Sequence, residues 1–246
     1  MTEPAFDVNE LGAADVAAAM ARPPHEATAW LRTVAEAGVA EAQVQLGQRR
    51  LDGVGAPANP AEGLLWFLKA ARTGHPMALN MAGRCYENGW GTAINMPLAA
   101  QFFRRAAHAG SDWGMYNYAT RLMLGEGVPA DRPAAFAWFR KAAALGHAKA
   151  INIVGGFHED GWETPRDLAA ARACYRQSAA LGDFRGQFNF GRVLAAEGEV
   201  QAALDWFEQS GRGATPAFRG KVCAFLRTAP VEAYRRLADR LEAIPQ

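Results

Sequence analysis

The residues best suited to chemistry in this chain are five histidines, three cysteines and a set of glycine-rich loops. His158, Glu159 and Asp160 are neighbours of metal-ligand types, but no second His or Cys lies at the spacing of a known zinc motif. The glycine-rich loops lack the G-x-x-x-x-G-K-[ST] pattern that cradles phosphates. No nucleophile is paired with a base, so the sequence predicts no catalytic residue, no metal site and no cofactor.

Cysteine usage and charge indicate the compartment and the class of partner. Cys85, Cys174 and Cys223 are odd in number and widely spaced in helical patterns, which indicates buried thiols in a reducing compartment. The acidic start is unlike a signal peptide, and no apolar run approaches the roughly 18 residues of a membrane span. A net charge of +1 gives no sign of a nucleic-acid partner. We therefore expect a cytoplasmic protein without a membrane span.

The elements that must position any site repeat at a fixed distance. Glycine recurs every 36 residues, at Gly38, Gly74, Gly110, Gly146 and Gly182. Two aromatic series keep the same step: Trp30, Trp66, Phe102 and Trp138, and Phe67, Phe103, Phe139 and Tyr175. Helix-capping residues precede them at Asn59, Asn95, Asp131 and Asp167. Each unit is therefore predicted to be a helix, a glycine loop, a second helix and a short turn.

Small residues recur at the same step and mark the face where two helices approach closely. They are Gly47, Gly83, Ala119, Gly155 and Gly191. Loop glycines follow them at Gly53, Gly89, Gly125 and Gly161. The pattern A-x-x-L-G, a G-x-G loop, an Asp or Asn cap and W-F-x-K-A-A-x-x-G resembles the Sel-one-like repeat (SLR), a relative of the tetratricopeptide repeat. The resemblance covers roughly residues 24 to 214.

The resemblance and the period together predict an all-α, right-handed solenoid of about fourteen helices, in which each helix pair buries its apolar face against its neighbours. Residues 1–38 are expected to form a degenerate pair, with helices at 8–21 and 25–37. Residues 39–214 hold four full units, at 39–74, 75–110, 111–146 and 147–182, and a shortened fifth that starts at Asp183. Residues 215–246 are expected to cap the stack with helices at 216–227 and 231–244.

The resemblance implies that the first helix of each pair lines a concave groove. The positions expected there change character from unit to unit, whereas packing positions stay aromatic or small. Aromatic residues and arginine dominate binding hot spots. The predicted partner-binding residues are Trp113, Tyr116, Met123, Asn80, Arg84, Lys149, Asn152, Arg185 and Phe188. The same positions also hold Glu159, Arg192 and Ala195. The alternative is that Trp113 and Tyr116 pack against the following helix.

Other surfaces are further candidates. Some tetratricopeptide domains hold a peptide's terminal carboxylate with Asn and Lys or Arg from successive first helices, and Asn117 and Asn189 would join Asn80, Asn152, Lys149 and Arg185 in such a clamp. Trp90 and Trp162 follow loop glycines and offer a surface on the loop edge, or else pack against the neighbouring loop. The last helix is interpreted as a cap, with a partner-binding tail as the alternative.

These observations predict a protein-interaction scaffold or adaptor of a bacterial cytoplasm, which binds a protein or peptide in its groove and is not an enzyme. A dedicated regulator or neutralising partner of one protein is the alternative. A groove-using enzyme is a third class, proposed for cysteine-rich SLR relatives. This chain lacks their cysteine pairs. Fold resemblance by itself does not specify the partner.

Overall fold

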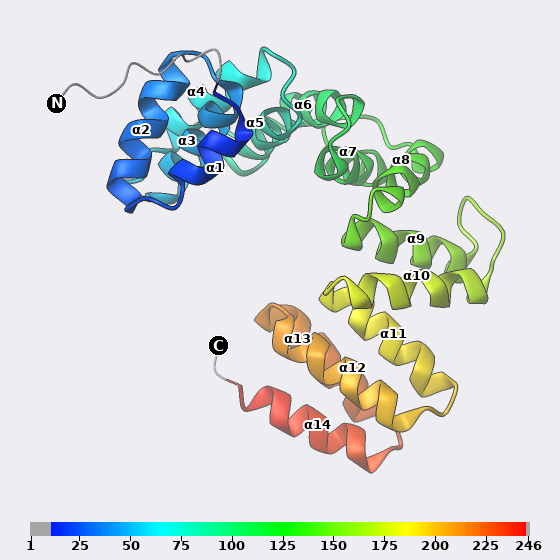
Figure 1. The fold of residues 1–246 in the computed structure, drawn as a ribbon. Helices are drawn as coiled ribbons and strands as arrows, with labels where there is room; N and C mark the ends of the chain where they lie inside the picture. The colour runs from blue at the N-terminus through cyan, green and yellow to red at the C-terminus, as the bar shows by residue number, and fades with distance from the viewer. Residues whose placement is uncertain (1–10, 245–246) are drawn as a thin grey trace. The chain divides into compact units, whose positions relative to one another are not determined.

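The computed structural model describes residues 11–244, and in these the regular secondary structure is fourteen α-helices and no strand (Figure 1). The residues divide into two compact units, Met1–Ala135 and Phe136–Gln246, and helix α8 (Arg132–Ala144) crosses the boundary. The all-α repeat architecture predicted from the 36-residue period is confirmed.

Helices alternate with loops in both units. The N-terminal unit contains α1 (Ala13–Ala19), α2 (Pro24–Glu36), α3 (Ala40–Asp52), α4 (Pro60–Ala71), α5 (Pro76–Asn88), α6 (Met96–His108) and α7 (Asp112–Leu124). The C-terminal unit contains α9 (Ala148–Asp160), α10 (Leu168–Ala180), α11 (Phe184–Ala196), α12 (Val200–Gly213), α13 (Pro216–Thr228) and α14 (Glu232–Glu242). Inside each unit, helices that follow one another in sequence pack together, as in the pairs α3–α4, α5–α6, α9–α10 and α11–α12.

The second helix of each of the four full repeats begins where its capping residue predicts. The side-chain oxygens of Asn59, Asn95, Asp131 and Asp167 each accept a hydrogen bond from the backbone N–H three residues later, at 2.9 to 3.1 Å. These bonds satisfy one of the N–H groups that a helix leaves without a partner in its first turn. All four predicted caps are confirmed.

First helices carry a capping series of their own, at the same step. His75 and His147 accept at Nδ1 from Ala78 N and Ala150 N over 3.4 and 3.2 Å. Ser111 and Asp183 make the equivalent bonds to Gly114 N and Gly186 N. The two histidines that the sequence places after repeat glycines are therefore capping residues of the turn.

In four of the five repeats an aromatic ring of the second helix packs on a glycine of the first, and in the remaining one that position is Ala119. A Cβ built on Gly83 would lie 2.6 Å from Cε1 of Phe103, and one on Gly191 would lie 2.8 Å from Cε1 of Phe207. Both rings are fully buried. The glycines therefore let the second helix come close enough for its aromatic ring to contact the first helix. The recurrence of small residues at this repeat position predicts this close approach.

The ends of the stack differ from the inner repeats. Helix α1 ends at Ala19, and the part of the predicted first helix before residue 11 lies outside the described residues. After Gly213, α14 packs on α12 and α13 and buries Tyr234, Leu237 and Leu241. The last helix therefore packs on the second helix of the shortened fifth repeat, and its role as a cap stays a prediction. The three-part division at residues 38 and 214 stays a prediction.

Candidate functional site

The first helices α5 and α7 lie side by side in the N-terminal unit. Nδ2 of Asn117 donates to Oδ1 of Asn80 over 2.8 Å, and Nη1 of Arg121 lies 3.4 Å from Oε1 of Glu87. Asn80 is only 3% exposed. Two of the predicted groove residues, Asn80 and Asn117, thus bind each other across the helix pair, which fixes the register between α5 and α7.

Apolar side chains are exposed on the same two helices. Met77 on α5 and Trp113 on α7 occupy equivalent repeat positions, and each is 40% exposed. The ring of Tyr116 lies edge-on to Trp113, with 6.4 Å between centroids and 82° between planes. Met123, the penultimate residue of α7, is half-buried. Trp113 and Tyr116 therefore contact each other on α7, and their role in binding a partner stays a prediction.

Arg84 and the loop tryptophans are placed by packing. The guanidinium of Arg84 lies 4.9 Å from the ring centroid of Trp90, which itself packs on the core formed by α5 and its neighbours. Trp162 is 47% exposed and meets Phe157 edge-on at 6.4 Å. Of the two loop-edge candidates, Trp162 therefore presents the larger apolar surface to solvent.

In the C-terminal unit, the predicted groove residues take mixed roles. Nδ2 of Asn189 donates to Oδ1 of Asn152 over 2.8 Å, which repeats the Asn117 contact two units later. Arg185 is exposed, with its guanidinium 4.5 Å from the ring centroid of Phe184. Lys149 is half-buried on α9.

Phe188 on α11 is held in an aromatic cluster. Its ring lies 5.9, 5.7 and 5.3 Å from the centroids of Phe207, Phe218 and Phe225. The last two residues belong to α13, which packs over the face of α11 that an open groove would expose. Phe188 thus contributes to the packing between α11, α12 and α13.

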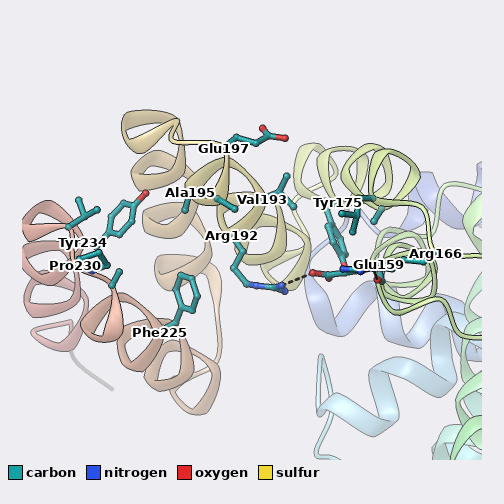
Figure 2. Close-up of a pocket in the computed structure, with 15 residues that line it drawn as sticks. Glu159, Arg166, Tyr175, Arg192, Val193, Ala195, Glu197, Phe225, Pro230 and Tyr234 are labelled. Carbon is teal, nitrogen blue, oxygen red and sulfur yellow. Dashed lines mark hydrogen bonds and ion pairs between the residues drawn. The ribbon is translucent and has the colours of Figure 1, made fainter.

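A pocket of about 670 Å³ lies in the C-terminal unit, with α9, α10 and α11 on one side and α13 and α14 on the other (Figure 2). Glu159, Arg192 and Ala195 line it, and all three occupy positions that the repeat pattern assigns to the groove. The remaining lining residues come from α10, α13, α14, the loops beside them, and two further positions of α11, Val193 and Ala196. The sequence analysis assigned groove positions only to the first helices of the repeats. It therefore could not identify three of the lining residues, Tyr175, Phe225 and Tyr234, which lie on other elements.

A charged network closes one side of this pocket. Glu159 accepts from the Tyr175 hydroxyl at 2.6 Å and from Nη2 of Arg192 at 2.7 Å. Burial alone would raise the pKa of Glu159, but the bond from Tyr175 and the charge and bond of Arg192 outweigh it, so the pKa lies below its ordinary value. Burial and the same carboxylate raise the pKa of Tyr175. Glu159 is therefore an anion at neutral pH and Tyr175 a neutral donor.

The metal-ligand side chains, the most deeply buried thiol and the helix lengths of the described residues each bear on function. They contain no group of three or more His, Cys, Asp or Glu side chains placed to hold a metal ion. Burial raises the pKa of the Cys85 thiol to about 11, so this thiol stays protonated at neutral pH and is a poor nucleophile. No helix in the described part of the chain is long and apolar enough to cross a membrane.

Comparison with known proteins identifies the repeat. The Sel1 repeat model, which is the Sel-one-like repeat, matches residues 40–75, 76–111, 114–147 and 148–183. These boundaries agree within three residues with the units predicted from the glycine period. No curated protein sequence matches the chain significantly.

Solved structures with this fold are distant in sequence. A protective antigen of uropathogenic Escherichia coli with an SLR fold is 24% identical, with a TM-score of 0.69 over 88% of this chain and 48% of the antigen. A Sel1 repeat protein from Oxalobacter formigenes is 24% identical, with a TM-score of 0.72 over 81% of this chain and 59% of that protein. An immunity protein of Pseudomonas aeruginosa is 18% identical, with a TM-score of 0.54 over 83% of this chain and 80% of that protein.

These similarities differ in what they establish. The chain spans less than two thirds of the length of the first two structures, and identities below 25% show the fold alone. The family model is more direct, because its four consecutive matches cover more than half of the chain and each falls on a helix pair of the structure. The chain therefore belongs to the Sel1 repeat family.

Proposed function

We propose that this protein is an interaction scaffold that binds a partner protein through the first-helix face of its repeats. Sel1 repeat proteins are in general protein-interaction scaffolds. Such a scaffold binds with a preformed surface, so the receptor loses little conformational freedom on association. No catalytic residue is needed for this activity. The free, mostly buried thiols support a cytoplasmic location.

The pair formed by exposed Trp113 and half-buried Tyr116 is the observation that carries the proposal. Single exposed apolar residues are normal on protein surfaces and need no explanation. Here, however, Trp113 is 40% exposed, Tyr116 lies against it, and Met77 is exposed at the equivalent position of the adjacent helix. In the second helices of the same unit, by contrast, Trp66 and Phe102 are buried. A tryptophan, a tyrosine and a methionine on one rigid face are the residue types enriched at protein interfaces.

The test begins with capture of a partner from the source cell by the wild-type protein and its identification. The affinity of the purified partner is then measured for wild type and for the Trp113→Ala, Tyr116→Ala double variant. We expect a loss of about 10-fold to 100-fold, the range of an interface hot spot. Leu65→Ala is the matched control, because Leu65 is exposed on the second helix α4. Equal affinity of wild type and a double variant that circular dichroism shows to be helical contradicts the proposal.

A dedicated neutralising partner of one protein is the second candidate. Two solved neighbours in the fold comparison are immunity proteins of Pseudomonas aeruginosa. Their likeness to this chain shows the fold alone, so the distinction must come from stoichiometry. A general adaptor is expected to bind several partners with moderate affinity, and a neutralising protein to bind one partner tightly at one to one. Calorimetric titration of each captured protein separates the two.

A further inference from the structure

The pocket beside α11 is large enough for a ligand and is built from two kinds of wall (Figure 2). Its volume of about 670 Å³ falls in the range of 300 to 1,000 Å³ typical of ligand sites. One wall is apolar and consists of Val193 and Ala195 on α11, Phe225 on α13, and Pro230 and Val231 in the turn before α14. Leu168, the first residue of α10, also lines the pocket and is 57% exposed.

Tyr234 gives this apolar wall a polar atom without a partner. The side chain is 3% exposed, and its hydroxyl makes no hydrogen bond among the described residues. Figure 2 shows the hydroxyl pointing from α14 toward the side of the pocket where Ala195 lies. A buried hydroxyl without a partner destabilises the free protein. An acceptor group supplied by a ligand would satisfy it.

The opposite wall is charged, with a net excess of one positive charge. Glu159 is already occupied by the Tyr175 hydroxyl and by Arg192. Nε of Arg166 donates to the backbone oxygen of Glu159 over 3.0 Å, and this is its only hydrogen bond within residues 11–244. The guanidinium of Arg166 thus keeps its Nη donors for a further group. Guanidinium donors of this kind bind carboxylates in bidentate geometry.

Glu197 does not offset this positive charge. Arg172 binds its carboxylate, with Nε 3.0 Å from Oε1, so the two charges compensate at the rim. A ligand that fits both walls therefore needs an apolar side chain for one and a carboxylate for the other. A basic group in the same place would meet Arg166 and Arg192 as like charges.

We propose that this pocket binds an acidic segment of a partner protein, in which an apolar side chain packs on Phe225 and Val231 and a neighbouring Asp or Glu binds Arg166. The inference rests on the proposed function, because its occupant is part of a protein partner. It adds the chemistry of the bound segment and assigns a second recognition site, in the C-terminal unit. A backbone carbonyl of the segment accepts from the Tyr234 hydroxyl.

The test uses the full chain and capped model peptides. The probe is acetyl-Gly-Gly-Phe-Asp-Gly-Gly-amide, and binding is followed by NMR titration of the backbone amides and the methyl groups of Val193 and Val231. We expect saturable shifts at these groups. Replacing Phe by Gly in the peptide, or Asp by Lys, should weaken binding at least 10-fold. Shifts confined to other parts of the protein, or equal binding of the Lys peptide, overturn the proposal.

Two protein variants locate the contacts. Arg166→Gln should lower the affinity for the Asp peptide several-fold and leave the affinity for a version with Asn in place of Asp unchanged. Arg176→Gln, at an exposed position of α10, is the control and should change neither affinity. Tyr234→Phe should keep or raise the unfolding midpoint of the free protein, and it should lower the affinity for the probe peptide. An Arg166→Gln variant that binds the Asp peptide like wild type contradicts the assignment of the carboxylate.

The outcome is separable from that of the proposed function. The peptide titration uses no native partner and does not depend on Trp113 or Tyr116. If the probe fails to bind while partner capture still requires Trp113, the pocket inference is wrong and the scaffold proposal stands. If the probe binds and the captured partner binds equally well without Trp113, the scaffold proposal is wrong in its choice of surface and the pocket inference stands.

Discussion

The side chains of Asn80 and Asn117 are joined by a hydrogen bond of 2.8 Å between two first helices, with Asn80 almost fully buried. A buried amide that loses its partner pays the cost of desolvation without compensation. Asn117→Ala should therefore destabilise the protein by about 1 to 2 kcal/mol in urea denaturation. Gln101→Ala, at an exposed site on α6, should stay within about 0.5 kcal/mol of wild type. Equal effects of the two substitutions would show that the Asn pair contributes nothing.

Gly83 tests the close approach of paired helices. A methyl group there would lie 2.6 Å from the buried ring of Phe103, so Gly83→Ala should cost about 1 to 3 kcal/mol through overpacking. Gly220, on α13, is the control because a Cβ there meets nothing within 4 Å. Gly220→Ala should stabilise the protein by about 0.5 to 1 kcal/mol, since alanine is the better helix former. A thermal or urea midpoint that moves the same way in both variants contradicts the packing argument.

Glu163 interrupts a series of glycines in the repeat loops. Gly55, Gly91 and Gly127 have φ between 73° and 77°, and Glu163 stands one repeat further with φ of 53°. A non-glycine residue is strained in this left-handed region, so Glu163→Gly should raise stability by about 0.5 to 1 kcal/mol. Glu163→Ala removes the same charge but keeps the strained backbone. If the alanine variant gains as much as the glycine variant, the effect is electrostatic and the prediction is wrong.

Glu62 should make stability depend on pH. Burial alone would raise the pKa of this carboxyl, but hydrogen bonds from Arg32 and Arg50 outweigh it, so the pKa falls below its ordinary 4.5. The unfolded chain then binds the proton more tightly than the folded protein does. The stabilisation is present at neutral pH and is lost as pH falls from about 4.5 through the lowered pKa.

The measurement is the unfolding midpoint of wild type and Glu62→Gln between neutral pH and pH 3. The variant should be less stable than wild type at pH 7, and the difference should shrink as the pH falls through the titration of Glu62. Glu36→Gln, at an exposed position of α2, provides the control for a surface carboxyl. A difference between wild type and Glu62→Gln that stays constant with pH would rule out the linkage.

Much of the fold follows from the sequence because packing forbids variation at certain positions. Gly83 and Phe103 must stay small and large together, since each fills the space that the other leaves. Caps such as Asn95 and Asp131 recur for the same reason, because every second helix begins with N–H groups that need an acceptor. Positions under such constraints repeat every 36 residues and so can be found from one chain alone.

The candidate sites are less predictable, for two physical reasons. Contacts at the predicted groove positions differ from unit to unit, so their residue types carry no signal at the 36-residue step. Whether such a position stays open depends on the helices beside it. Phe188 shows this, since α13 brings Phe218 and Phe225 onto it. Tyr234 lies beyond Gly213, where the 36-residue period ends. The repeat pattern therefore could not predict that this residue lines the pocket.

The hydrogen bond between Asn80 and Asn117 returns as the bond between Asn152 and Asn189, two repeats later and not one. The intervening step of the series carries Tyr116 and Ile153 instead. Loss of a single 36-residue unit, residues 117–152, would bring Ile153 into the place of Asn117 and leave buried Asn80 opposite an aliphatic chain. Loss of residues 117–188 would instead set Asn189 opposite Asn80. By this criterion the structural module that keeps the Asn–Asn bond is a pair of repeats and not a single one.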